Sequence, residues 1–264
     1  MNTFPLFNQL DSPNVKILTL CLHKNEVIMF RIIFLILLFH ISLIGLSQSL
    51  SSEELLLNAI DYHDPNNNWP SFNEEFTVTM ETPNSSDRKS NVKINLPAER
   101  FRLTVNKEQN IQEYILDGND CLLRLNGSEE ISETERKTFN LNCDRANMLK
   151  DYYTYLYGLP MKLKDPGTII DPKVMHKTFK NKAYLVLKVT YAESVGGDTW
   201  YFYFNPLTYG MEVYQFFHDE SKNDGEYILL SGEETINEIK MPKKRAWYYN
   251  QDNTHLGTDI LSKD

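Results

Sequence analysis

Residues 198–219 constrain the fold more than any other stretch of this chain. They read DTWYFYFNPLTYGMEVYQFFHD, two aromatic-rich arms joined by a link that contains Pro206 and Gly210. Proline and glycine in a short link favour a turn, and each arm has the length of one strand. Alternation along the first arm gives two faces, Trp200, Phe202 and Phe204 on one and Tyr201 and Tyr203 on the other.

The second arm of this predicted hairpin divides in the same way. The sequence predicts one face with Met211, Val213, Gln215 and Phe217 and another with Glu212, Tyr214, Phe216 and His218. Both faces of the hairpin are therefore largely apolar or aromatic. Because apolar faces must be buried against another layer, both faces need cover.

Further strand-like segments lie on both sides of a central helical pattern. Spacing of about ten residues with short turns is typical of an antiparallel meander. In residues 100–105, apolar Phe101 and Leu103 alternate with charged or polar residues, which indicates one wet face. The predicted strands, besides the hairpin, cover 75–80, 91–96, 100–105, 111–116, 121–125, 183–192, 226–230, 235–239, 246–249 and 256–261.

Two helices are predicted. Residues 51–62 carry an apolar stripe, with Ser52 as the expected cap, and residues 143–157 carry a second stripe that ends at Gly158. A charged segment, 128–137, is expected to be exposed. We predict an α+β, mainly β fold, in which a curved antiparallel half-barrel of about eleven strands carries an N-terminal helix and an inserted helix packed on or in it.

The N-terminal segment has the pattern of a secretory signal peptide. Residues 32–46 are almost all apolar and follow Arg31, and small residues then suggest cleavage after Ser47. The predicted organisation is a mis-assigned extension at 1–28, a signal peptide at 29–47 that starts at Met29, and one β-rich domain at 48–264. An uncleaved signal anchor is the alternative.

Export to an oxidising compartment would allow the cysteines to form a disulfide. Of three cysteines in the chain, Cys121 and Cys143 follow the proposed cleavage point. An exported chain with an even number of cysteines favours a disulfide, which would staple the 143–157 helix to the strand at Cys121. Two unpaired thiols remain the alternative, because spacing fixes no geometry.

The chain carries no familiar catalytic, phosphate-binding or dinucleotide-binding motif. His63 and Asp64 are interpreted as a cap or loop, and no metal or cofactor is expected. His218 beside Asp219 is the best polar cluster, and it stands where a strand meets a turn. A net charge of −9 and no basic stripe argue against nucleic-acid binding. The one basic run, residues 243–245, is interpreted as a solvated turn.

Three phrases resemble an exported family of gram-negative bacteria with no assigned function. They are YLYGLPMKL at 155–163, DTWYFYF at 198–204 and GEYILLSG at 225–232. The order of elements is architecturally similar to the Lol-type lipoprotein carriers. That resemblance implies a half-open apolar cavity and does not imply lipoprotein transport.

The resulting hypothesis is a periplasmic or secreted, non-enzymatic protein that binds a lipid, acyl chain or lipoprotein, with helix 143–157 and loop 159–167 as a lid. A hydrolase using His218 and Asp219, and a structural envelope protein packed on a partner, are the alternatives. After signal cleavage no integral membrane span is expected. The predicted cavity wall consists of Trp200, Phe202, Phe204, Tyr153, Leu156 and Met161. If the strand register differs by one residue, Tyr201 and Tyr203 would line the cavity in place of Trp200, Phe202 and Phe204.

Overall fold

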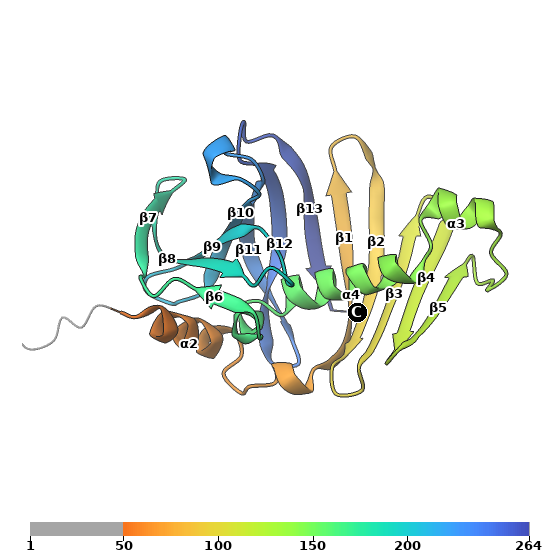
Figure 1. The fold of residues 1–264 in the computed structure, drawn as a ribbon, viewed down its shortest axis with the longest axis horizontal. Helices are drawn as coiled ribbons and strands as arrows, with labels where there is room; N and C mark the ends of the chain where they lie inside the picture. Colours follow the sequence, from red (N-terminus) through yellow and green to blue (C-terminus); the bar gives the residue numbers. More distant parts are fainter. Residues whose placement is uncertain (1–49, 264) are drawn as a thin grey trace, which may run out of the picture. The chain divides into compact units, whose positions relative to one another are not determined.

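Thirteen strands form one antiparallel sheet in the computed structural model, which describes residues 50–263 (Figure 1). The strands are β1 (Asn73–Thr82), β2 (Ser85–Asn95), β3 (Arg100–Lys107), β4 (Asn110–Asp117), β5 (Asp120–Leu125), β6 (Thr168–Ile170), β7 (Met175–Phe179), β8 (Lys182–Tyr191), β9 (Thr199–Phe204), β10 (Met211–Phe217), β11 (Glu226–Ile236), β12 (Ile239–Tyr249) and β13 (His255–Ser262). The helices are α2 (Ser52–His63), α3 (Glu133–Phe139) and α4 (Cys143–Tyr157), with short 3-10 turns η1 (Trp69–Ser71), η2 (Met161–Lys164) and η3 (Glu220–Lys222).

The order of the strands explains why the sheet is open. It runs β5-β4-β3-β2-β1-β13-β12-β11-β10-β9-β8-β6, and β7 pairs with β8. The C-terminal strand β13 pairs with β1 and so joins the first meander to the later strands. Because β5 lies at one end of this order and β6 and β7 at the other, the sheet does not close into a barrel. The predicted curved antiparallel half-barrel is confirmed.

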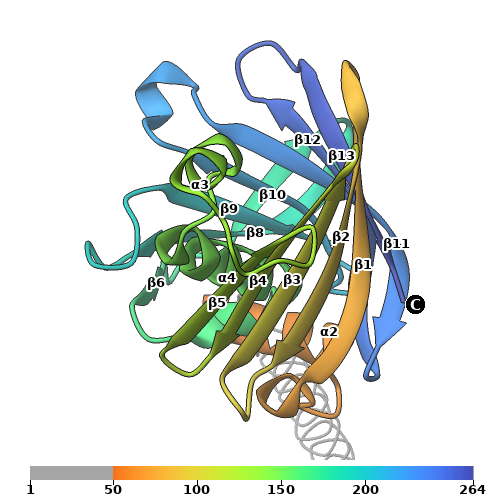
Figure 2. The ribbon, with the colours of Figure 1, turned by 90° about the vertical axis from the view of Figure 1, so that its right-hand side faces the viewer.

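Helix α4 lies against the concave face of the sheet (Figures 1 and 2). Its buried side chains are Ala146, Tyr153, Leu156 and Tyr157, and they join the main hydrophobic core with residues of both halves of the sheet. The ring of Tyr157 lies 4.9 Å from that of Phe76 on β1, between ring centroids. The helix therefore occupies part of the concavity of the half-barrel.

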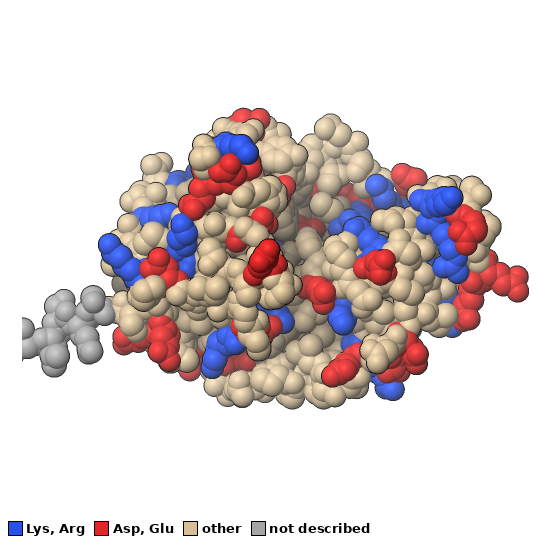
Figure 3. Space-filling view, viewed as in Figure 1, with Lys and Arg blue, Asp and Glu red and all other residues tan. Residues whose placement is uncertain are grey.

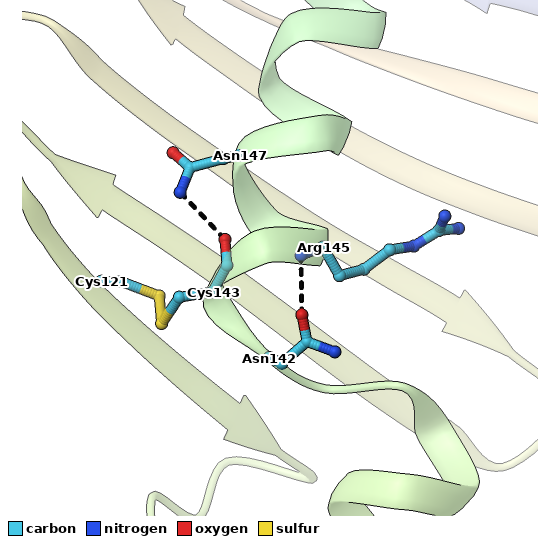
Figure 4. Close-up of a disulfide and its surroundings, with 5 residues drawn as sticks. All are labelled: Cys121, Asn142, Cys143, Arg145 and Asn147. Carbon is cyan, nitrogen blue, oxygen red and sulfur yellow. Dashed lines mark hydrogen bonds between the residues drawn. A yellow bond between two sulfur atoms is a disulfide. The ribbon is translucent and has the colours of Figure 1, made fainter.

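A disulfide fixes the start of α4. Cys143 is the first residue of the helix and is bonded to Cys121 on β5 (Figure 4). Asn142 caps the helix by accepting a hydrogen bond of 2.7 Å from the backbone N–H of Arg145. The predicted staple between the helix and this strand is confirmed.

The second face of the β9–β10 hairpin has its own cover. Tyr184, Val186, Tyr201, Tyr203 and Val213 form a smaller core on the face opposite α4. Phe179 of β7 packs onto it, with its ring centroid 5.3 Å from that of Tyr203. The expectation that both faces of the aromatic hairpin need cover is thus confirmed.

A β-bulge corrects one predicted face. The pairing of β9 with β10 shifts between Met211 and Val213, so Met211 lies opposite Phe204 while Val213 lies opposite Tyr203. Met211 therefore belongs to the main core and Val213 to the smaller one. The assignment of both residues to one face was wrong, because the extra residue of a bulge reverses the alternation.

Other local predictions also need correction. The predicted strand 235–239 is not one strand: it contains the end of β11, a tight turn with Asn237 and Glu238 at positive φ, and the start of β12. The charged segment 128–137 is largely exposed, as expected, and its residues from Glu133 onward form α3, whose capping box pairs Ser132 with Glu135. The side chain that caps α2 is Ser51 rather than Ser52. Strands β6 and β7 were not anticipated.

The basic run 243–245 was also misinterpreted. It lies within β12 and not in a solvated turn, and Arg245 is only 1% exposed. The predicted extension, signal peptide and cleavage point lie outside the described residues. None of the helices within residues 50–263 is long and apolar enough to cross a membrane.

Candidate functional site

A groove of about 980 Å3 lies beside α4. Its walls are α4, the turn between β2 and β3, and the loop of residues 192–198 that leads into β9. Figure 3 shows that this face of the described part is hollowed in its middle, with acidic and basic side chains around the hollow. The size falls within the range of pockets that hold small molecules, about 300–1,000 Å3.

One face of α4 lines the groove. Met148, Tyr152 and Tyr155 contribute to the wall. Their spacing of four and three residues places them on one side of a helix, away from the stripe of Tyr153 and Leu156 that packs on the sheet. Helix α4 therefore buries one face in the core and presents another to the groove.

Aromatic rings make up much of the groove wall. The ring centroid of Tyr155 lies 5.9 Å from that of Trp200 and 6.2 Å from that of Tyr191, both in edge-on contact. Trp200 also stacks on Phe216, with 4.8 Å between centroids. Such rings combine large apolar area with a polar edge, which suits a wall that meets both hydrocarbon and water.

The tyrosine hydroxyls of this wall stay neutral. The hydroxyls of Tyr155 and Tyr191 are hydrogen-bonded to each other. Burial raises the pKa of Tyr155 well above its ordinary value, and burial raises the pKa of Tyr191 to about 12. Neither hydroxyl therefore supplies a phenolate at neutral pH.

Charged residues border the aromatic wall. Lys162 forms an ion pair with Asp165, and both line the groove. Asp198 also lines the groove, and its Oδ1 lies 2.8 Å from Nδ1 of His218. This hydrogen bond with Asp198 raises the pKa of His218. The other charged lining residues are Glu99, Arg100, Lys150 and Asp151.

Of the residues predicted to form a cavity wall, Trp200 lines the groove. Phe202 and Phe204 are 0% exposed and lie in the main core. Tyr153, Leu156 and Met161 are also buried there. The alternate face with Tyr201 and Tyr203 belongs to the smaller core on the opposite side of the sheet. Sequence reasoning did not identify Met148, Tyr152 and Tyr155, although their helical spacing could have indicated a second apolar stripe.

The polar cluster at the end of β10 does not form a shared pocket. The side chain of His218 is 64% exposed and faces Asp198. Asp219 instead caps η3, where its carboxylate accepts a hydrogen bond from the backbone N–H of Ser221 and pairs with Lys222. His218 and Asp219 therefore do not converge on one reacting centre. Within residues 50–263, no cluster of three or more His, Cys, Asp or Glu side chains could hold a metal ion.

Comparison with known families places the chain. The model of a family of unknown function, DUF6503, matches residues 31–264. The chain belongs to this family. The expected membership of a family without an assigned function is therefore confirmed. No curated protein matches the chain.

Several solved structures are similar to this DUF6503 chain. A LolA superfamily protein from Nitrosomonas europaea is 13% identical, with a TM-score of 0.46 over 81% of this chain and 93% of that chain. An outer membrane lipoprotein-sorting protein domain from Vibrio parahaemolyticus is 10% identical, with a TM-score of 0.42. The match covers 80% of this chain and 92% of that chain. A DUF1329 family protein from Desulfovibrio piger is 10% identical, with a TM-score of 0.40 over 80% and 90%.

Proposed function

We propose that this chain is an exported, non-enzymatic protein that binds the hydrocarbon part of a lipid, an acyl chain or a lipoprotein in the groove beside α4. The observation that carries the proposal is the groove itself. The groove has a volume of about 980 Å3, and its wall includes the aromatic side chains Phe101, Tyr152, Tyr155, Tyr191 and Trp200. An apolar wall of this size with charges at its border matches an amphiphile better than a fully polar ligand.

The Cys121–Cys143 disulfide supports export. Disulfides form and persist in oxidising compartments and are rare in the cytosol of mesophiles. The bond also holds the N-terminal end of α4, which carries one wall of the groove. A binding wall held in place by a covalent link loses less conformational freedom when a ligand binds.

The first test is identification of bound material. The chain is purified without detergent, measured by native mass spectrometry, and extracted with organic solvent for lipid analysis. The proposal expects a mass adduct that disappears on extraction and an amphiphile in the extract. A protein that carries no adduct and also fails to bind added dodecanoate or dodecanol contradicts the proposal.

A pair of glycine variants locates the binding site. Gly196 lines the groove and Gly197 does not, and neither has a positive φ. An added Cβ meets nothing within 4 Å at either position, so both accept a side chain. We expect Gly196→Phe to weaken dodecanol binding by about tenfold or more, because the ring occupies groove volume. The matched control Gly197→Phe keeps wild-type affinity, and equal loss in both variants places the ligand elsewhere.

A further inference from the structure

A cluster of buried polar side chains lies on the concave face, beyond the residues that line the groove. Within the described residues, every buried side-chain nitrogen or oxygen found without a hydrogen-bond partner belongs to this cluster. Buried polar groups are ordinarily satisfied, so a concentration of exceptions in one place calls for a physical reason. We name it the interior polar cluster, and it consists of Arg88, Ser90, Tyr157, Tyr214, Arg245 and Asp259.

Strand register brings the charged members together. Arg245 on β12 lies opposite Asp259 on β13, Asp259 lies opposite Met80 on β1, and Met80 lies opposite Arg88 on β2. Residues directly opposite each other in antiparallel strands share a face. Ser90 is two residues from Arg88 and therefore lies on the same face. Four adjacent strands thus present two guanidinium groups and one carboxyl group in a row.

Two tyrosines border this row. Tyr157 from α4 lies over Arg245, with 4.0 Å between the guanidinium carbon and the ring centroid. Tyr214 from β10 is fully buried, and its ring contacts that of Trp247 at 6.3 Å. The hydroxyl of Tyr157 is a potential hydrogen-bond donor without a protein partner, and the hydroxyl of Tyr214 has the guanidinium of Arg245 beside it. Figure 3 shows a hollow over β13 and β1, the strands at the centre of the row.

The cluster carries more positive than negative charge. Arg88 and Arg245 face a single carboxyl group, Asp259, whose Oδ2 already accepts a hydrogen bond of 3.1 Å from the indole Nε1 of Trp247. Arg245 donates to the carbonyls of Pro242 and Leu156, at 2.9 and 3.4 Å, and these partners carry no charge. A buried cation is costly unless it is paired with an anion. The excess of positive charge therefore favours an anionic ligand.

The interior polar cluster borders the groove. Tyr152 lines the groove, and the charges of Asp259 and Arg88 both act on its hydroxyl. Trp200 also lines the groove, and its ring centroid lies 6.1 Å from that of Tyr214. A ligand whose hydrocarbon part lies in the groove could therefore place its polar head group in the interior polar cluster, at the inner side of the aromatic wall.

We propose that the interior polar cluster is an anion-binding site for the carboxylate or phosphate head group of the bound amphiphile. Arg88 and Arg245 supply the positive charge, and the hydroxyls of Ser90, Tyr157 and Tyr214 supply neutral hydrogen bonds. The assignment rests on the proposed function, since the groove holds the hydrocarbon.

The test compares three probes by calorimetry at neutral pH. Dodecanoate has a chain and an anion, dodecanol has the chain alone, and inorganic phosphate has the anion alone. We expect the wild-type chain to bind dodecanoate about tenfold or more tightly than dodecanol, because a hydrogen-bonded charge pair adds to the apolar contacts. Equal affinities for dodecanoate and dodecanol overturn the anion site and leave the proposed function standing.

Two variants at adjacent positions of β2 test whether Arg88 supplies the positive charge that binds the head group. Arg88 is half-buried on the concave face, and Lys89 is exposed on the other face of the same strand. Arg88→Gln should remove the preference for dodecanoate, while Lys89→Gln, which loses the same charge, should keep it. Ser90→Ala gives a second, smaller loss and covers the case in which Arg88→Gln does not fold. A preference that survives both concave-face variants overturns the site.

The measurements with inorganic phosphate show whether the cluster binds the head group of an amphiphile or a free anion. Binding of inorganic phosphate that depends on Arg88, together with no binding of dodecanol or dodecanoate, supports the anion site and overturns the groove function. Phosphate that competes with dodecanoate in the wild-type chain, but not in Arg88→Gln, supports a shared site for head groups. Absence of binding by all three probes overturns both proposals.

Discussion

The imidazole of His63 joins α2 to two distant strands. Its Nε2 accepts a hydrogen bond of 3.0 Å from the backbone N–H of Met211, and its Nδ1 lies 2.6 Å from the carbonyl oxygen of Lys240. Because a carbonyl only accepts, Nδ1 carries the proton and the ring is neutral. The interpretation of His63 as a structural residue at the end of the first helix agrees with these bonds.

Replacement of His63 should destabilise the fold and change its response to acid. His63→Ala leaves a buried N–H and a buried carbonyl without partners, so we expect a loss of about 3 kcal/mol in the free energy of unfolding. Burial lowers the pKa of His63 in the folded chain. The unfolded chain therefore binds the proton more readily, and this contribution to stability is present above about pH 6.5 and is lost as the pH falls through the folded pKa.

Urea unfolding at pH 7.5 and 5 measures this effect. The difference in stability between wild type and His63→Ala should be larger at the higher pH. His255→Ala is the control, because His255 is exposed on β13, where its ring contacts Tyr248 and its Nε2 is within hydrogen-bond distance of the nearby Thr258 hydroxyl. An equal difference at both pH values would show that the pKa of His63 does not differ between the folded and unfolded chains.

Two glycines with positive φ should differ sharply when replaced. At Gly225, with φ +76°, an added Cβ would lie 2.2 Å from the backbone oxygen of Phe216, so the β10 backbone would have to move. At Gly118, with φ +56°, the same atom meets nothing within 4 Å. We expect Gly118→Ala to cost about 1 kcal/mol and Gly225→Ala well over 2 kcal/mol, measured by chemical unfolding. Similar losses at both positions would contradict the close approach at Gly225.

The sequence pattern predicts the individual strands and helices of this fold better than the contacts between them. The alternation of Phe101 and Leu103 with polar residues predicts β3, since one face of that strand is wet. The helical stripe of residues 143–157 and the stop at Gly158 predict α4, whose end depends on local backbone groups. Both features are encoded within a few residues, and both are present in the structure.

The groove and the interior polar cluster both depend on contacts between distant segments. Arg245 is a charged residue in a basic run, and sequence pattern favours a solvated position for it. It is buried because α4, which ends almost ninety residues earlier, covers β12 and offers Arg245 the carbonyl of Leu156. Likewise, whether Tyr152 or Tyr153 lines the groove depends on which face of α4 the sheet covers. No local rule supplies that information.

The disulfide should contribute measurably to stability. The bond closes a loop with a sequence separation of 22 residues, for which restriction of the unfolded chain gives about 3 kcal/mol. We expect the double variant Cys121→Ser, Cys143→Ser to lose about that much in the free energy of unfolding. Reductant should lower wild-type stability by a similar amount and leave the double variant unchanged. A further loss in the double variant with reductant would point to a cause other than this bond.

Asp259→Asn should change both pH dependence and ligand affinity. Burial raises the pKa of the Asp259 carboxyl, against the opposing effect of Arg245 and Arg88. The folded chain thus holds this proton more tightly than the unfolded chain. The contribution to stability is present below about pH 4 and is lost as the pH rises through the folded pKa. Asparagine cannot ionise, so wild-type stability minus variant stability should decrease from pH 4 to pH 7 in urea unfolding.

The same variant tests the interior polar cluster through charge. Asparagine keeps an oxygen that can accept the hydrogen bond from the indole of Trp247 and removes the carboxylate that opposes an anionic ligand. With Arg88 and Arg245 left in place, dodecanoate affinity at neutral pH should rise by about tenfold, because a like charge has been removed near the head group. Dodecanol affinity should stay unchanged, since it carries no charge. If affinity for both probes rises equally, the substitution acts on the groove rather than on an anion site.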